Sequence, residues 1–330
     1  MNLATTYMGF ELPHPMVPGA GPFVDNLDTV RRLEDAGAPM IVMHSLFEEQ
    51  IARGDANFTR SMETPKDSYA EALSYFPDPD DFVLGPEDYL EQIRKIKAAV
   101  AVPVIGSLNG TTEGGWLRYA RLIEQAGADG LELNLYELAL DLEQTGADVE
   151  RCGLEVVRAV KGSVKIPVAV KLSPFYSSIG NFAHRLDEAG ADALVLFNRF
   201  YQPDINVDQQ ELLRVNLSSP AELLLRVRWI GALSGRIRPS LAATGGVHTA
   251  IDVVKAVMAG AHVTQMVSAL LQHGPAYLRQ VCNDLERWLE EHEFESLRQM
   301  QGSMSLLRCG DPGAYQRANY IRLLQSWDAG

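Results

Sequence analysis

The 330-residue chain has little cysteine, no long apolar run and a shortage of basic side chains. Its 3 cysteines form no Cys-X-X-Cys pair, which argues against a cysteine-built metal or iron–sulfur site and favours a reducing, cytoplasmic compartment. No apolar stretch approaches the roughly 20 residues of a membrane span. The first residues lack the basic segment and apolar core of a signal peptide. With 29 basic and 43 acidic side chains the net charge is −14, which argues against nucleic acid or an anionic membrane as partner.

What the chain does have is a recurring Ala-Gly-Ala tripeptide, at 36–38, 126–128, 189–191 and 259–261. Each copy follows a helix-like stretch and precedes a short apolar run. The glycine suits the left-handed turn after a helix, and the run is typical of a buried parallel strand. Each run ends on polar residues, and the carboxyl ends of parallel strands are where such folds do chemistry.

Eight strands are predicted in all, with a helical pattern between each strand and the next. This alternation predicts an α/β fold of the TIM (β/α)8 barrel type, with a doubly wound sheet as the alternative. The expected strands are 15–20, 40–45, 102–108, 130–134, 166–173, 192–198, 239–244 and 262–268, and the expected helices are 28–36, 86–99, 114–125, 149–160, 179–188, 220–233 and 249–258.

We expect a single domain over 1–330, with the barrel at about 15–275 and an N-terminal hairpin before it. The segment 47–85 follows the second strand and is rich in Asp and Pro. It is either a lid over the substrate or a surface excursion. Residues 275–330 form a helical extension, whose acidic amphipathic helix is expected to pack outside the barrel or at a dimer contact.

A glycine pair, Gly245–Gly246, follows the seventh strand in the stretch ATGGVHT. Glycines between a strand and a helix let the backbone approach a phosphate, and the helix N-terminus supplies free N–H groups. TIM barrels commonly bind phosphate after strands seven and eight, and Ser268 and Ala269 follow the eighth. An ordinary turn is the alternative, but this position in the barrel favours a phosphate site.

Lysine and asparagine side chains stand at the ends of other strands. Lys171 ends the fifth strand among apolar neighbours, and a lysine is rarely found inside a barrel without a partner or an anion. A lysine that extends to the rim is the alternative. Asn109, Asn134 and Asn198 follow strands three, four and six. Amides suit a ligand with alternating N–H and C=O groups, although a single asparagine is more often a cap or turn residue.

These motifs resemble those of the dihydroorotate dehydrogenases, which are FMN-binding TIM barrels, and particularly of their soluble class, over about residues 1–275. LATTYMGFELPHPMVPGAG, LELN, VAVKLSP, LFN and ATGGV occur in the family's order. The resemblance implies that Lys171 contacts the flavin pyrimidine edge, where a cation stabilises the anionic reduced flavin. It implies that Asn134 and Asn198 hydrogen-bond the substrate, and that Gly19, Ala20, Gly21, Lys171, Gly245, Gly246, Ser268 and Ala269 contact FMN. From their places at the strand ends, His44 is a further candidate for binding substrate, and Ser45, Asn109 and Asn134 are further candidates for contacting FMN.

The chain departs from the family at three elements that recognise or activate the substrate. After strand four the family has Asn-X-Ser-Cys-Pro-Asn, or Ser in place of that Cys, and this side chain is the base. Here NLYELA places Glu137 at that position. The family's lysine after strand two is missing from Met43-His44-Ser45, and its Asn-Ser-Met-Gly motif has no counterpart in 69–77.

Glu137 is therefore the candidate base, because a lid that excludes water would raise the pKa of its carboxyl group. A protonated His44 would offset the repulsion between this carboxylate and an anionic substrate. Tyr136 is a second candidate acid or base. In the alternative interpretation, Glu137 begins a short helix and faces solvent.

The sequence thus predicts an FMN-dependent oxidoreductase that converts dihydroorotate to orotate in pyrimidine biosynthesis. Its candidate catalytic residues are Glu137, Lys171 and His44, and no metal is expected. The alternatives are an FMN enzyme for another cyclic or unsaturated substrate, a non-catalytic barrel that binds flavin or phosphate, and a lyase or isomerase of a sugar phosphate. The resemblance leaves the electron acceptor open between fumarate and a separate iron–sulfur/flavin subunit. It argues against the membrane-bound class, and it suggests a homodimer.

Overall fold

The computed structural model describes residues 1–47, 86–110, 113–199, 204–208, 211–213, 217–313, 320–321 and 325–326. The predicted lid-like segment 47–85, including the stretch 69–77, therefore lies outside the described residues except for Phe47.

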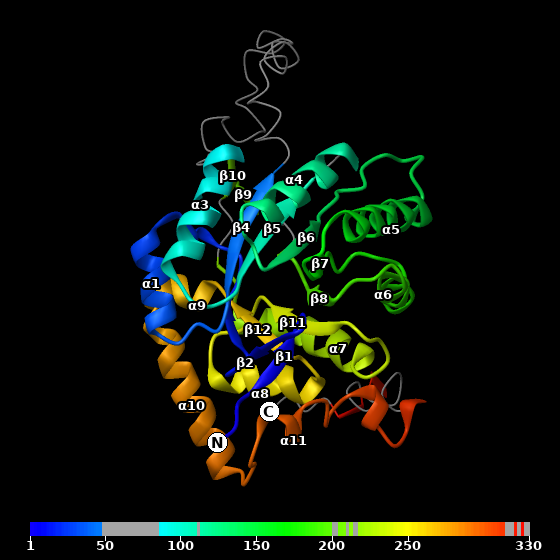
Figure 1. Ribbon diagram of the computed structural model, residues 1–330. Coiled ribbons are helices and arrows are strands. Elements are labelled where there is room, and N and C mark those ends of the chain that lie inside the picture. Colours follow the sequence, from blue (N-terminus) through cyan, green and yellow to red (C-terminus); the bar gives the residue numbers. More distant parts are fainter. Residues whose placement is uncertain are drawn as a thin grey trace.

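Eight parallel strands alternate with helices along the chain and form one sheet (Figure 1). Their order around the sheet is β3, β12, β11, β8, β7, β6, β5 and β4, and contacts between β3 and β4 nearly close it. The prediction of a TIM barrel is confirmed. The strands are β3 (Met16–Pro18), β4 (Ile41–Phe47), β5 (Val104–Asn109), β6 (Gly130–Leu135), β7 (Val168–Leu172), β8 (Ala193–Leu196), β11 (Ser240–Thr244) and β12 (Val263–Met266).

The seven predicted helices are all present and lie around the strands (Figure 1). Side chains cap the first turns of three of them. The Asn26 side chain accepts from the backbone N–H groups of the first helix, and Thr145 and Asp148 form a capping box. None of the described helices combines the length and apolar character needed to cross a membrane. The helices are α1 (Leu27–Asp35), α3 (Pro86–Ala99), α4 (Glu113–Gln125), α5 (Gly146–Ser163), α6 (Ile179–Glu188), α7 (Leu223–Leu233) and α8 (Ala250–Ala259).

The Ala-Gly-Ala tripeptides form the turns that the sequence predicts. Gly37, Gly127, Gly190 and Gly260 have φ angles of +101°, +99°, +94° and +122°, and each stands between a helix and the next strand. A side chain at such a φ angle is strained, so the repeat marks four points where the chain turns back into the barrel.

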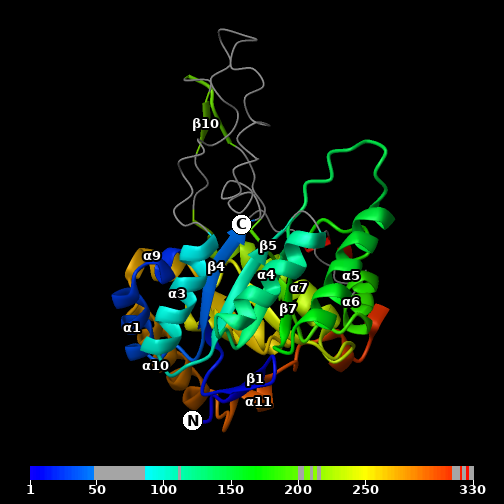
Figure 2. The same cartoon turned by 45° about the horizontal axis from the view of Figure 1, so that its top comes forward.

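The barrel interior is filled from its amino-terminal end by small and branched apolar side chains. Ala169, Ala193 and Ala242 leave room there for the hairpin of β1 (Thr5–Tyr7) and β2 (Phe10–Leu12), which contributes Tyr7 and Met8 to the same cluster. Figure 2 shows β1 at the end of the barrel opposite β10. The hairpin therefore fills one end of the barrel interior.

Two parts of the chain lie outside the minimal barrel. A short hairpin, β9 (Asp204–Asn206) with β10 (Glu211–Leu213), follows β8 and was not predicted. After α9 (Ser268–His273), the helix α10 (Tyr277–Glu291) buries Leu278, Val281, Leu285 and Leu289 and contacts α8 and α9. This is the expected position outside the barrel, and the dimer contact stays a prediction. The short helix α11 (Leu297–Met300) follows.

Candidate active site

Asn134 and Lys171 lie side by side at the carboxyl ends of β6 and β7. The register pairs these two residues directly, so their side chains leave the sheet on the same face. Ala169, two residues before Lys171, belongs to the cluster inside the barrel. Both polar side chains therefore point into the barrel mouth, where Asn134 is 6% and Lys171 is 7% exposed.

Glu132 holds the Lys171 ammonium group inside this mouth. Lys171 Nζ lies 3.2 Å from Glu132 Oε1, and Gln265 Nε2 of β12 donates to Glu132 Oε2 at 2.8 Å. Glu132 is 1% exposed, so the pair is almost fully removed from water. Sequence reasoning assigned a role to Lys171 but none to Glu132 or Gln265. The available signal was the spacing, because Glu132 and Asn134 are two residues apart on one strand and so share a face.

Asn198 reaches the same place from the segment after β8. Its Nδ2 donates to Asn134 Oδ1 at 3.0 Å, and its backbone N–H donates to the carbonyl of Leu172 at 2.8 Å. This bond uses Nδ2 of Asn198 and Oδ1 of Asn134. The other two amide groups, Nδ2 of Asn134 and Oδ1 of Asn198, take no part in it. The structure thus brings together the two asparagines that were predicted to bind substrate.

His44 lies on β4, half-buried against Tyr89 of α3, with the ring centroids 5.3 Å apart in an edge-on arrangement. His44 Nδ1 is 3.0 Å from Asp25 Oδ1, although the contact lacks hydrogen-bond geometry. Burial lowers the pKa of His44, and the Asp25 carboxylate opposes that shift only in part. The imidazole is therefore harder to protonate than a free one, which weakens its predicted role as a positive charge near the substrate.

Ser45 and Asn109 lie near the carboxyl ends of the neighbouring strands β4 and β5. Ser45 Oγ is 2.8 Å from Ser107 Oγ, and Asn109 is 5% exposed. The buried Tyr89 hydroxyl accepts from the Ser107 N–H at 2.9 Å and lies 3.0 Å from the carbonyls of Ser107 and His44. Sequence reasoning missed Tyr89, because an aromatic residue on an amphipathic helix is normally a core residue. Here its hydroxyl fixes the ends of β4 and β5.

Gly19 and Gly21 pack tightly against the end of β12. The Gly19 N–H donates to the carbonyl of Met266 at 3.1 Å. A Cβ atom at Gly19 would come within 3.0 Å of Gln265 and Val267, and one at Gly21 within 3.1 Å of Val267. Larger residues would push this segment, including the half-buried Ala20, away from the strand ends.

The Gly245–Gly246 pair forms a tight turn whose shape requires glycine. The φ angles are +88° and +79°, and a Cβ atom at Gly246 would lie only 2.4 Å from the backbone nitrogen of Leu223. The Gly246 N–H points at Ser218 Oγ, 3.3 Å away, and Ser218 Oγ donates to Ser268 Oγ at 2.8 Å. The predicted Ser268 is thus beside the glycine pair, and Ser218 is an additional hydroxyl that sequence reasoning missed.

The start of α8 differs from the expectation of free N–H groups. Asp252 Oδ2 accepts from the N–H groups of Thr249 and His248, at 2.9 and 3.1 Å. A carboxylate therefore already caps this end of the helix. Beside the glycine pair the Gly246 N–H donates to the Ser218 hydroxyl and that hydroxyl donates to Ser268, while Ala269 is fully buried in the first turn of α9.

A buried arginine lies beneath the same turn. Arg226 of α7 is 6% exposed, its Nε donates to the carbonyl of Thr244 at 2.9 Å, and a Cβ atom at Gly245 would lie 2.8 Å from its guanidinium. Burial lowers the pKa of Arg226, and Glu222 opposes this. The sequence signal was its position on the buried face of α7, three residues after Leu223 and four before Ile230. A positive charge therefore stands next to the predicted phosphate site.

Glu137 lies apart from these residues, in the loop between β6 and α5. Its side chain is exposed, and Gln144 Nε2 donates to its Oε1 at 2.9 Å. The alternative interpretation placed Glu137 at the start of a short helix and in solvent. No helix begins at Glu137, so the first part is wrong, but the side chain does face solvent. After burial, the charge of Glu137 is the second cause that raises the pKa of Tyr176. The structure does not bring Glu137 into the buried cluster with Lys171 and Asn134.

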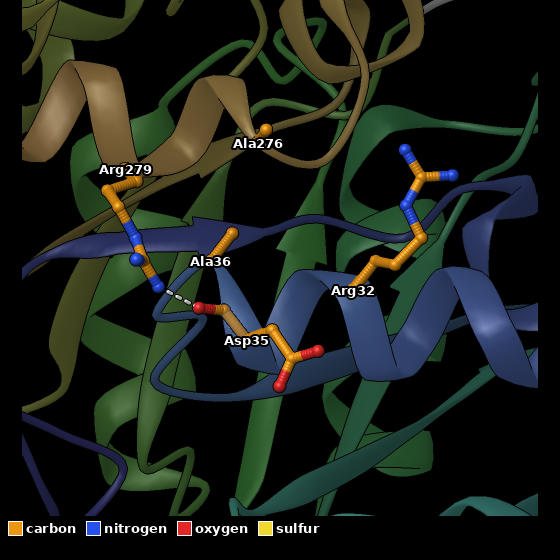
Figure 3. Close-up of a pocket in the computed structure, with 5 residues that line it drawn as sticks. All are labelled: Arg32, Asp35, Ala36, Ala276 and Arg279. Carbon is orange, nitrogen blue, oxygen red and sulfur yellow. Dashed lines mark hydrogen bonds between the residues drawn. The ribbon is translucent and has the colours of Figure 1, made fainter.

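The described surface also has a pocket far from the strand ends. It has a volume of about 290 Å³ and lies between α1 and the start of α10 (Figure 3). Arg279 donates there to the carbonyl of Asp35, while Arg32 projects from the other side. Its lining shares no residue with the candidate site. Within the described ranges, no group of three or more His, Cys, Asp or Glu side chains could hold a metal ion.

The sequence model of the family described as dihydroorotate dehydrogenase matches residues 2–289. Two relatives carry the name "Dihydroorotate dehydrogenase B (NAD(+)), catalytic subunit". The protein of Thermoplasma volcanium is 28% identical over 308 residues, which cover 91% of this chain and 98% of the relative. That of Methanothermobacter thermautotrophicus is 28% identical over 309 residues, covering 91% and 97%. The chain therefore belongs to the dihydroorotate dehydrogenase family, whose members are flavin-dependent oxidoreductases that act on CH–CH groups.

Proposed function

We propose that this protein is an FMN-dependent enzyme that oxidises dihydroorotate to orotate, the reaction that its relatives' names describe. The observation that carries the proposal is the hydrogen-bonded pair Asn134–Asn198 directly beside the buried Lys171. Two amides and a cation in one mouth match a substrate ring that alternates N–H and C=O groups and bears a carboxylate.

The described residues fit a flavin mononucleotide. Gln265 Oε1 is a buried oxygen that has no hydrogen-bond partner among the described residues, and it belongs to the side chain that also contacts Glu132. The glycine pair, two serine hydroxyls and the nearby Arg226 provide donors and positive potential suited to a phosphate. We infer that Lys171 and Gln265 face the ring of FMN and that Gly245, Gly246, Ser218 and Ser268 hold its phosphate.

Bound FMN supplies the hydride acceptor for the reaction. The protein's part is then to hold the substrate and move one proton. Asn134 and Asn198 orient the substrate amides, and Lys171 places positive charge beside the ring that gains electrons. Glu137 serves as the base once it leaves Gln144 and turns toward the substrate, a movement that its exposed loop permits.

A second candidate is an FMN enzyme for another cyclic or unsaturated substrate. It is favoured by one observation, the exposed carboxylate of Glu137 in place of the family's Cys or Ser base. A charged base repels an anionic substrate such as dihydroorotate, whereas a neutral cyclic amide or a nitrogen heterocycle brings no such penalty.

We also infer that electrons leave through a separate protein, because the relatives are named catalytic subunits with NAD⁺ as acceptor. Fumarate is the alternative acceptor, and it needs no partner. Anaerobic addition of fumarate to the reduced protein separates the two, since prompt reoxidation would exclude the need for a partner.

The visible spectrum of the purified protein tests the first step of the proposal. We expect a yellow protein, or a colourless one that becomes yellow with added FMN. Anaerobic mixing with dihydroorotate should then bleach the flavin and release orotate. A protein that takes up FMN but is not bleached by dihydroorotate belongs to the second candidate, and one that takes up no FMN contradicts both.

A further inference from the structure

The ammonium group of Lys171 does not stand alone in the barrel mouth. Lys171 Nζ is 3.2 Å from Glu132 Oε1, and the two side chains are 7% and 1% exposed. Charges that are this well shielded from water act over longer distances than surface charges. A flavin ring placed near Lys171 therefore also experiences the opposite charge of Glu132.

The carboxylate of Glu132 is held in one orientation from both sides. Gln265 Nε2 donates to Oε2 at 2.8 Å, while Lys171 occupies Oε1. The three side chains come from β6, β7 and β12, so strands on different sides of the barrel fix the group. Both oxygens are engaged, which leaves Glu132 little freedom to turn away.

The field of Glu132 also reaches other buried groups. Burial is the main cause that raises the pKa of Tyr7 and of Tyr89, and the charge of Glu132 is a further cause in both. Tyr7 comes from the N-terminal hairpin and Tyr89 from α3, so the effect spans the interior and the wall of the barrel. The Glu132 carboxylate thus acts on buried groups other than Lys171.

We propose that Glu132 is a positioning residue that fixes the Lys171 ammonium beside the flavin and, by offsetting its charge, lowers the reduction potential of the bound flavin. This inference rests on the FMN-binding part of the proposed function and not on the identity of the substrate. Without the Glu132 charge, Lys171 would stabilise the anionic reduced ring more strongly. The pair therefore makes electron release to the acceptor easier and uptake from the substrate harder.

The test compares the midpoint potential of FMN in the wild-type protein and in Glu132→Gln, by anaerobic spectroelectrochemical titration. Glutamine keeps an oxygen for Lys171, and the Gln265 amide can turn to present its unpaired Oε1 to the new amide group. We expect the equilibrium to shift toward reduced flavin by about tenfold, which is ~30 mV for a two-electron couple. Glu132→Asp keeps the charge and should restore most of the wild-type potential.

The matched control is Glu150→Gln, which removes a carboxylate that is buried outside the barrel and paired with Arg185 at 3.0 Å. It should leave the potential unchanged. If Glu132→Gln does not fold, Lys171→Met is compared with the double variant Glu132→Gln/Lys171→Met. These two proteins also differ by the Glu132 charge alone, so FMN should have the higher midpoint potential in the double variant.

An unchanged potential in the charge-removing variants, or equal shifts in Glu132→Gln and Glu132→Asp, would overturn the inference, because packing alone would then explain the effect. If the wild-type protein binds no FMN, the proposed function fails and this inference fails with it. If FMN binds but dihydroorotate does not reduce it, only the assignment of the substrate fails. The midpoint potentials of the variants then still test the role of Glu132.

Discussion

The carboxyl end of β6 leads directly from an almost fully buried carboxylate, Glu132, to an exposed loop. Glu132 and Asn134 are 1% and 6% exposed; Glu132 is bonded to side chains of β7 and β12, and Asn134 to Asn198 after β8. A few residues later, Leu140 and Leu142 are 78% and 97% exposed, and Glu137 bonds only within its own loop. The chain therefore passes from a fixed site to a movable one within ten residues.

This contrast separates two tasks of an enzyme. A group that tunes a cofactor must keep its distance and orientation, so it is placed on strands inside a barrel. A group that meets a changing substrate must move, so it is placed on a loop. The residues predicted to bind the cofactor lie mainly in the fixed region, and the candidate base, Glu137, lies in the exposed one.

The largest effect is expected from Lys171→Met, which leaves the Glu132 carboxylate buried without its cation. The free energy of unfolding should fall by about 3–5 kcal/mol, as measured by urea denaturation. The double variant Glu132→Gln/Lys171→Met should recover most of this loss, because a buried pair replaced as a whole costs little. If Lys171→Met is as stable as the wild type, water must reach Glu132 in the barrel mouth, and the site is then not the buried one described here.

Glu137→Gln tests the movable region. If Glu137 is the base, anaerobic flavin reduction by substrate should slow by about 100-fold in stopped-flow measurements. Glu143→Gln, an exposed carboxylate of the same loop, is the control and should react at the wild-type rate. A normal rate in Glu137→Gln would return this residue to a solvent-facing role, and Tyr136 would become the next candidate.

Gly246→Ala tests the phosphate end of the fixed region. The added Cβ atom would lie 2.4 Å from the Leu223 nitrogen at a φ of +79°, so the turn must open. We expect the dissociation constant of FMN to rise by about tenfold or more, for a cost of ~1–2 kcal/mol at a left-handed φ. Gly180→Ala in α6 is the control, since no atom lies within 4 Å of its new Cβ. Equal FMN affinity in both variants would argue against a phosphate at this turn.

The smallest effect is expected from Leu142→Ala, because this side chain is almost fully exposed. The free energy of unfolding should change by no more than about 0.5 kcal/mol. Leu133→Ala, a fully buried leucine of β6, should cost about 2–5 kcal/mol. If both variants lose similar amounts of unfolding free energy in thermal or urea melts, the Leu142 side chain is packed in solution. The loop would then not differ from the buried strand.

The sequence was sufficient for most of the fixed region. Ala-Gly-Ala marks chain reversals that only glycine makes easily, so the strands and helices could be placed from local rules. Lys171, Asn134, Asn198 and the glycine pair were found because each follows a strand. Glu132 and Gln265 stand among the polar strand ends but received no role, and Tyr89 was missed, because their roles depend on which side chains meet across the barrel.

The sequence by itself determined the order of strands and helices, the polar strand ends and the departure from the family at Glu137, because these are properties of neighbouring residues. Only the tertiary structure decided that Lys171 shares its buried site with Glu132 and Gln265, that Asp252 already caps α8, and that Glu137 stands in solvent. Such facts depend on distances between segments far apart in the chain. Burial and charge pairing are properties of the closed barrel and not of any one strand.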